Sequence, residues 1–147
     1  MKTPLLNFLA LIICNALSAQ DISERMVPSV VLNTFNVAYP TAIDVEWEQK
    51  GKFYEVEFEL DWNMDHEIWY NEEGKVIKHK EDVAVDTLPQ KVKTKIKENY
   101  RAYSIDDLHR ITTDKEVVYS MDLNSFLQQD WEIVINENGE ILNKLAD

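Results

Sequence analysis

The chain has one cysteine, Cys14, and it lies inside the apolar run from Leu5 to Leu17 that follows Lys2. A positive start, roughly a dozen apolar residues and small residues at the end are typical of a secretory signal peptide. The run is shorter than the ~20 apolar residues of a membrane-spanning helix. We therefore expect residues 1–19 to be removed on export to a periplasmic or secreted location. The mature chain would then have no disulfide, thiolate zinc site or cysteine nucleophile.

Glycine and histidine are also scarce, so the sequence offers few of the residues that phosphate-binding loops and histidine-based catalytic sites require. The chain has three glycines, each placed as in a turn: Gly51, Gly74 and Gly139. Its three histidines show no metal-ligand spacing such as His-x-x-x-His: His66, His79 and His109. No glycine-rich phosphate loop and no serine-nucleophile motif is present. The sequence thus predicts a protein that is not an enzyme and has no cofactor, and the alternative of a small hydrolase would need a closed pocket.

Positive charge is in deficit, since 15 lysines and arginines face 27 acidic residues for a net charge of −12. An acidic balance of this size argues against binding to nucleic acid or to anionic membranes. It suits a soluble protein whose partners are cations, basic proteins or nothing charged. Four Trp, six Tyr and five Phe provide enough apolar bulk for a folded core in spite of the charge.

What the chain has instead is an internal repeat. After Val27-Pro28, apolar residues follow at four-residue steps up to Tyr39, and the same steps follow Leu88-Pro89 up to Tyr100. Each series forms one apolar face of an α-helix, with proline at its start. An alternating strand and an Asn-Glu-x-Gly turn come next in both halves, where the glycine permits the positive φ of a hairpin.

The repeat predicts an α+β fold of two tandem modules, residues 20–82 and 83–147, after the signal peptide. Each module has one helix, near 27–39 and near 88–100, on one face of a four-stranded antiparallel meander. The eight strands are expected near 43–48, 53–62, 66–71, 75–80, 105–112, 116–123, 131–136 and 140–145.

These features resemble a known family. Pro-x-x-Val-x-x-x-Phe-x-x-x-Tyr-Pro (28–40), Tyr-Glu-Val-Glu-Phe (54–58) and Asn-x-x-Gly before a last strand look like the PepSY-like, β-lactamase-inhibitor-like periplasmic proteins. The resemblance covers the chain from about Val27 to Leu145. It implies the fold described above and a small exported binding or inhibitory protein, and some similar proteins are suspected of responding to calcium.

Strand alternation predicts which residues point away from the helices. In the first module this open face would carry acidic side chains and one tryptophan: Asp44, Glu46, Glu48, Glu55, Glu57, Glu59, Glu67 and Trp69. In the second module the equivalent face is mixed: Leu108, Arg110, Val118, Ser120, Asp122, Glu132 and Val134. Like charges on neighbouring strands repel one another, and a partner would relieve that cost. Trp69 would be an exposed recognition anchor, while the alternative is a solvated sheet face without a ligand.

A calcium site is a second hypothesis for the acidic residues. Asp61, Asn63, Asp65 and Glu72 fall at positions 1, 3, 5 and 12 of an EF-hand-like loop. His66 replaces the turn glycine and strands replace the flanking helices, so a polar hairpin explains the same residues. The leading prediction is a non-enzymatic binding or inhibitor-like protein that engages an unknown exported protein or peptide through its open sheet face. The alternative is a calcium-responsive periplasmic protein.

Overall fold

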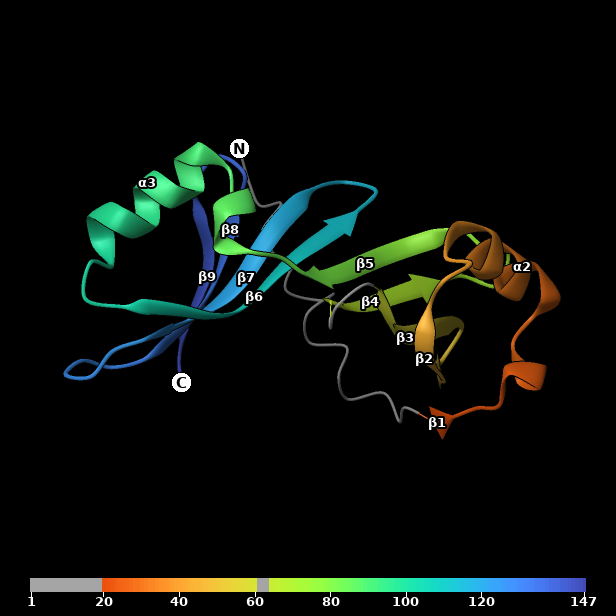
Figure 1. Ribbon diagram of the computed structural model, residues 1–147. Helices are drawn as coiled ribbons and strands as arrows, with labels where there is room; N and C mark the ends of the chain where they lie inside the picture. Colours follow the sequence, from red (N-terminus) through yellow and green to blue (C-terminus); the bar gives the residue numbers. More distant parts are fainter. Residues whose placement is uncertain (1–19, 61–63) are drawn as a thin grey trace.

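The computed structural model describes residues 20–60 and 64–147, and within them it forms a helix-on-sheet fold (Figure 1). The predicted signal peptide, Asp61 and Asn63 lie outside the described residues. The helical elements are η2 (Glu24–Met26), α2 (Ser29–Ala38), η3 (Val85–Thr87) and α3 (Gln90–Asn99). The strands are β1 (Gln20–Asp21), β2 (Ile43–Lys50), β3 (Phe53–Leu60), β4 (Met64–Tyr70), β5 (Val76–Asp82), β6 (Ser104–Thr113), β7 (Val117–Asn124), β8 (Trp131–Asn136) and β9 (Ile141–Ala146).

The two α-helices begin after proline, as the repeat predicts. The Pro28 carbonyl accepts the first helical hydrogen bond of α2, from the Leu32 amide, and the Pro89 carbonyl accepts the equivalent bond of α3. Proline costs nothing at this point, because the first amides of a helix have no partner inside it. Each helix buries the apolar residues of its four-residue steps against the sheet.

The sheet is antiparallel throughout, with its nine strands in sequence order from β1 to β9. Residues that pair across an antiparallel ladder lie on the same face, and one such row runs unbroken from Phe58 through His66, Glu81 and Arg110 to Tyr119. Phe58 packs in the core beneath α2 and Tyr119 packs in the core beneath α3. Both α-helices therefore cover the same face of one continuous sheet, and neither covers the other face, which we call the open face.

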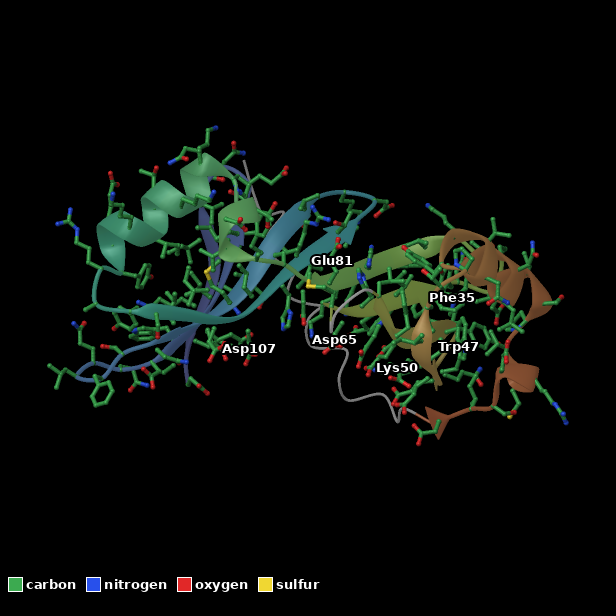
Figure 2. All side chains as sticks on the ribbon, viewed as in Figure 1. Phe35, Trp47, Lys50, Asp65, Glu81 and Asp107 are labelled. Atoms are coloured by element: carbon green, nitrogen blue, oxygen red, sulfur yellow. The ribbon has the colours of Figure 1, made fainter. Side chains whose placement is uncertain are left out.

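Two hydrophobic clusters lie under the helices. The first centres on Phe35 of α2, which meets Trp47 and Phe58 edge-on at ring-centroid distances of 5.4 and 5.0 Å (Figure 2). The second centres on Val92 and Ile96 of α3. The α+β class, the two helices and the antiparallel meander are confirmed, and each predicted element ends within two residues of its counterpart in the described chain. The division into modules 20–82 and 83–147 stays a prediction.

A bulge interrupts the first sheet strand after each α-helix. The β2–β3 register shifts between Ile43 and Glu46, and the β6–β7 register shifts between Asp106 and His109. Each bulge contains an aspartate with positive φ, Asp44 at 50° and Asp107 at 43°. An extra residue reverses the alternation of the strand on one side of it.

The bulge in β6 corrects part of the predicted open face. Leu108 is buried in the core under α3 rather than on the open face. Arg110 pairs with Tyr119 in the helix-covered row, so it too was assigned to the wrong face.

Candidate functional site

The open face of the first half carries the predicted acidic residues, but two members of that set are not exposed. Glu55 is 1% exposed and Trp69 is 5% exposed. The expectation that these two side chains are free for a partner is therefore wrong. The remaining five, Glu46, Glu48, Glu57, Glu59 and Glu67, are exposed or half-buried.

Two lysines of the same face account for the burial of Trp69. Lys78 Nζ lies 4.1 Å from the centroid of the indole ring, and Lys50 Nζ lies 5.4 Å from it. The indole Nε1 donates a 2.9 Å hydrogen bond to Glu67. The tryptophan thus lies under lysine side chains whose ammonium groups are attracted to the face of the ring.

The same lysines neutralise the innermost carboxylates. Lys50 Nζ is 2.7 Å from Glu55 and 3.2 Å from Glu48, and Lys78 Nζ is 2.8 Å from Glu67. Burial raises the pKa of Glu55 in spite of Lys50, because desolvation of the carboxylate outweighs the ion pair. Burial would also raise the pKa of Glu67, but Lys78, then Lys80 and Lys50, hold it below its usual value.

Beside this ion-paired patch the open face forms a groove of about 430 Å³. We call it the acidic groove. Eight carboxylates line it, together with Lys80, His109 and parts of Phe58 and His66: Asp44, Glu46, Glu57, Glu59, Asp65, Glu67, Asp82 and Asp107. Strands β2 to β6 contribute these residues, so both halves of the chain take part, and Asp65 and Asp107 lie toward the middle of the molecule (Figure 2).

Most of the charge in the acidic groove lacks a counter-charge. Asp82 is paired with His109 at 2.7 Å, and Glu67 is paired with lysines. Within residues 20–60 and 64–147, no lysine, arginine or histidine nitrogen lies within 4.0 Å of the other six carboxylates. Burial, and then the negative charges of Glu67 and Glu48, raise the pKa of Glu57. A bound cation would reverse that effect of the neighbouring charges.

The structure does not bring together Asp65 and Glu72, the described members of the EF-hand-like set, and Asp61 and Asn63 lie outside the described residues. Asp65 lies in β4, and Glu72 lies beyond the other end of the same strand, in the turn before β5. Tyr70 lies five positions after Asp65 along the extended strand, about 16 Å away at the usual rise. One ion cannot bind both carboxylates, because an EF-hand needs a compact loop where this chain forms a strand.

Several residues of the site were not predicted as a group. Asp82 and Asp107 bring acidic side chains from β5 and β6 into the acidic groove. A second exposed feature lies between β7 and β8, where Phe126 is 104% exposed and Leu127 is 94% exposed. We call this exposed part of the β7–β8 loop the tip. The sequence signal that could have identified it is a pair of adjacent apolar residues in an otherwise polar loop.

The comparison with known families agrees with the resemblance in the sequence. The profile of the family described as "Putative beta-lactamase-inhibitor-like, PepSY-like" matches residues 16–78 and again residues 61–143. These matches span most of the chain, so the protein belongs to this PepSY-like family. The description is of an inhibitor-like protein and names no catalytic activity. No curated protein matches the sequence.

Solved structures from Bacteroides species share the fold. One of the "putative periplasmic proteins" from Bacteroides eggerthii matches with a TM-score of 0.70 and 17% identity, covering 82% of this chain and 88% of its own. A DUF2874 family protein from Bacteroides uniformis matches at 0.68 and 20%, covering 81% and 88%. A BLIP-like protein from Bacteroides fragilis matches at 0.65 and 21%, covering 81% and 86%. At these identities the likeness establishes the fold alone. In the described part of the chain, no helix is long and apolar enough to cross a membrane.

Proposed function

We propose that the protein is an exported, non-enzymatic binding protein, inhibitor-like in its action, that engages a partner protein through the acidic groove. The observation that carries the proposal is the group of six carboxylates in the groove with no counter-charge among the described residues. Like charges at this density repel one another, and lysines or arginines from a partner would relieve the repulsion.

The lining of the acidic groove favours protruding basic side chains over a small apolar ligand. Its volume of about 430 Å³ is within the usual size of a ligand pocket, but its lining is carboxylate. Small-molecule pockets are mostly apolar with a few polar groups. A groove lined by acids instead attracts and orients a basic segment of a protein.

The exposed tip at Phe126 and Leu127 is an apolar feature outside the lining of the acidic groove, and we include it in the proposal as a separate contact for a large partner. Aromatic side chains, phenylalanine among them, are enriched in protein–protein interfaces. Trp69, the expected recognition anchor, is covered by lysines, whereas Phe126 is fully exposed and available for this contact.

Export supports a partner outside the cytoplasm. The first 19 residues have the pattern of a signal peptide, and the relative from Bacteroides eggerthii is described as periplasmic. The family description makes a β-lactamase the first enzyme to test as a partner.

A charge-reversal experiment tests the proposal. Glu57→Lys with Glu59→Lys changes the acidic groove, whereas Glu72→Lys with Glu73→Lys makes the same change in net charge at the exposed β4–β5 turn. The wild type and both variants are immobilised, exposed to a β-lactamase and to periplasmic extract, and washed at increasing salt.

We expect a partner to be retained by the wild type and the turn variant and lost from the groove variant. Salt should weaken retention, because exposed charges are screened within a Debye length of about 8 Å at physiological ionic strength. Equal loss from both variants would mean that net charge alone holds the partner. Retention by the groove variant would exclude the acidic groove as the contact surface.

Calcium binding in the acidic groove is the second candidate function, and it rests on the same oxygen-rich lining. The carboxylates of Glu55, Glu57 and Glu67 approach within 4.8 Å of one another. Lys50 and Lys78 already neutralise two of them, so the more exposed acids of the groove suit Ca²⁺ better. Thermal melts in EDTA, millimolar calcium and millimolar magnesium test it, since a ligand at 100 times its Kd adds about 2.7 kcal/mol. Coincident curves would exclude calcium, and a rise in calcium alone would support it.

A further inference from the structure

Two of the three histidines of the chain meet on the helix-covered face, opposite the acidic groove. His66 lies in β4 and pairs across the ladder with Glu81 of β5. His79 precedes Glu81 by two residues on the same strand, so its side chain is on the same face. Figure 2 shows Glu81 near the middle of the molecule, where the sheet passes from one half to the other.

The two imidazole rings are within bonding distance of each other. His66 Nδ1 lies 3.0 Å from His79 Nε2, and His79 Nδ1 lies 4.0 Å from Glu81 Oε1. One donor atom from each of the three residues can be chosen so that all lie within 4.8 Å of one another. Two nitrogens bound at 2.0–2.1 Å to a tetrahedral zinc ion are ~3.3 Å apart. The N···N separation is thus within a few tenths of an ångström of the one a shared ion requires, and both rings would have to turn their lone pairs toward that ion.

Aromatic neighbours pack against both rings, and burial disfavours their charged form. The His66 ring stacks on Phe58, with centroids 5.2 Å apart and planes 14° apart, and the His79 ring lies edge-on to Tyr39. Burial lowers the pKa of both histidines, against the opposing effect of Glu81. Burial thus favours the uncharged imidazole, which is the form that binds a metal.

The Glu81 carboxylate offers the third metal-ligand atom, and Arg110 already fixes its orientation. Arg110 donates from Nε and Nη2 to Glu81 Oε1, at 2.9 and 2.7 Å. Among the described residues, no group donates a hydrogen bond to Oε2. A ligating carboxylate that is itself held by a hydrogen bond is the usual arrangement at metal sites.

We propose that His66, His79 and Glu81 bind a divalent transition-metal ion of the zinc type. Imidazole nitrogen suits zinc, copper and nickel, whereas calcium and magnesium require oxygen ligands, of which this cluster offers one carboxylate. Three protein ligands leave one coordination position for water or for a group of a partner. The side chains of His79 and Glu81 are 20% and 15% exposed, so an ion can reach them from solvent.

Titration of the untagged wild-type protein with zinc chloride, followed through its histidine side-chain NMR signals, tests the proposal. Because the chain has three histidines, each ring can be followed separately. One equivalent of zinc should shift the signals of His66 and His79 and leave those of His109 in place. Calcium and magnesium should shift none of them. The absence of any shift with zinc, or an equal shift at His109, would overturn the proposal.

Variants provide a second measurement. His66→Gln, His79→Gln and Glu81→Gln should each weaken zinc binding in calorimetry by roughly tenfold or more, the loss seen even when a residue that only supports a ligand is changed. His109→Gln is the matched control, since His109 lies on the other face against Asp82, and it should bind zinc as the wild type does. Unchanged affinity in all three ligand variants would overturn the proposal. If a variant does not fold, as judged by circular dichroism in EDTA, the wild-type NMR titration decides.

Discussion

Removal of Lys50 should destabilise the protein far more than removal of an ordinary surface lysine. Lys50 is 15% exposed and lies 2.7 Å from the carboxylate of Glu55, which is 1% exposed. Lys50→Met keeps most of the aliphatic stem of the side chain but leaves the Glu55 charge inside the face without its nearest cation. The adjacent Lys52 is exposed, so Lys52→Met is a matched control.

The size of the effect follows from the burial of Glu55. Breaking one partner of a buried ion pair costs about 3–5 kcal/mol, whereas an exposed pair contributes about 0–1 kcal/mol. Lys78 still acts on Glu55 in the variant, so we expect a loss of about 3 kcal/mol, at the lower end of the buried range. For a chain of this size that corresponds to a decrease in Tm of roughly 10 °C. Lys52→Met should stay within about 0.5 kcal/mol of the wild type.

Urea unfolding at two pH values measures this directly. The folded-state pKa of Glu55 is raised by burial, so the folded protein accepts a proton there before the unfolded chain does. The penalty of Lys50→Met should therefore be largest at neutral pH and shrink as the pH falls toward 4.5, the ordinary value for a glutamate. The double variant Lys50→Met, Glu55→Leu should recover most of the loss, because it leaves no buried charge. A penalty below about 1 kcal/mol, or one that does not depend on pH, would refute the reasoning.

Three further predictions concern the turns, the bulges and the tryptophan. Gly74→Ala should lower the free energy of unfolding in urea by about 2 kcal/mol or more, because φ is +77° and the new Cβ would lie 3.0 Å from Thr34 Oγ1. Gly51→Ala should lower it by only about 1 kcal/mol, because nothing lies within 4 Å of the new Cβ. Equal costs would contradict this. Asp107→Val should lower the free energy of unfolding by about 1–2 kcal/mol and Asp107→Gly should not, since φ is 43°; the opposite order would argue against the bulge. Trp69→Ala should lower Tm through a loss of about 3–5 kcal/mol, and an unchanged Tm would mean that the indole is exposed.

The helices, strands and turns could be predicted because each depends on local spacing. The four-residue steps from Val27 to Tyr39 give α2, and the alternation at 54–58 gives β3. The positions of the bulges in β2 and β6 could not be predicted in this way. A bulge adds one residue without a change in composition, so Leu108 was assigned to the open face although it packs beneath α3. The one trace in the sequence is an aspartate at each bulge, a residue type that tolerates positive φ.

For the candidate site, the sequence predicts which side of the sheet each residue lies on, but not whether that residue is exposed to a partner. Alternation assigned Trp69 and Glu55 to the open face, and the register agrees. It says nothing of what covers them, and Lys50 and Lys78 come from other strands of the same face. The contact between His66 and His79 could not be predicted for the same reason, because residues 13 apart in the sequence become neighbours only through the β4–β5 register.

The lysines also decide which part of the acidic face can bind a partner. Glu48, Glu55 and Glu67 belong to ion pairs with Lys50, Lys78 and Lys80, so a basic partner would have to displace an internal cation to reach them. That exchange gains little, since one lysine replaces another at similar distances. The carboxylates nearer the two bulges have no such partner among the described residues, and there each new ion pair adds to the binding energy. The preference of a basic partner should therefore fall on the end of the open face that contains Asp44 and Asp107, and the ion-paired patch around Trp69 should act as its rigid support.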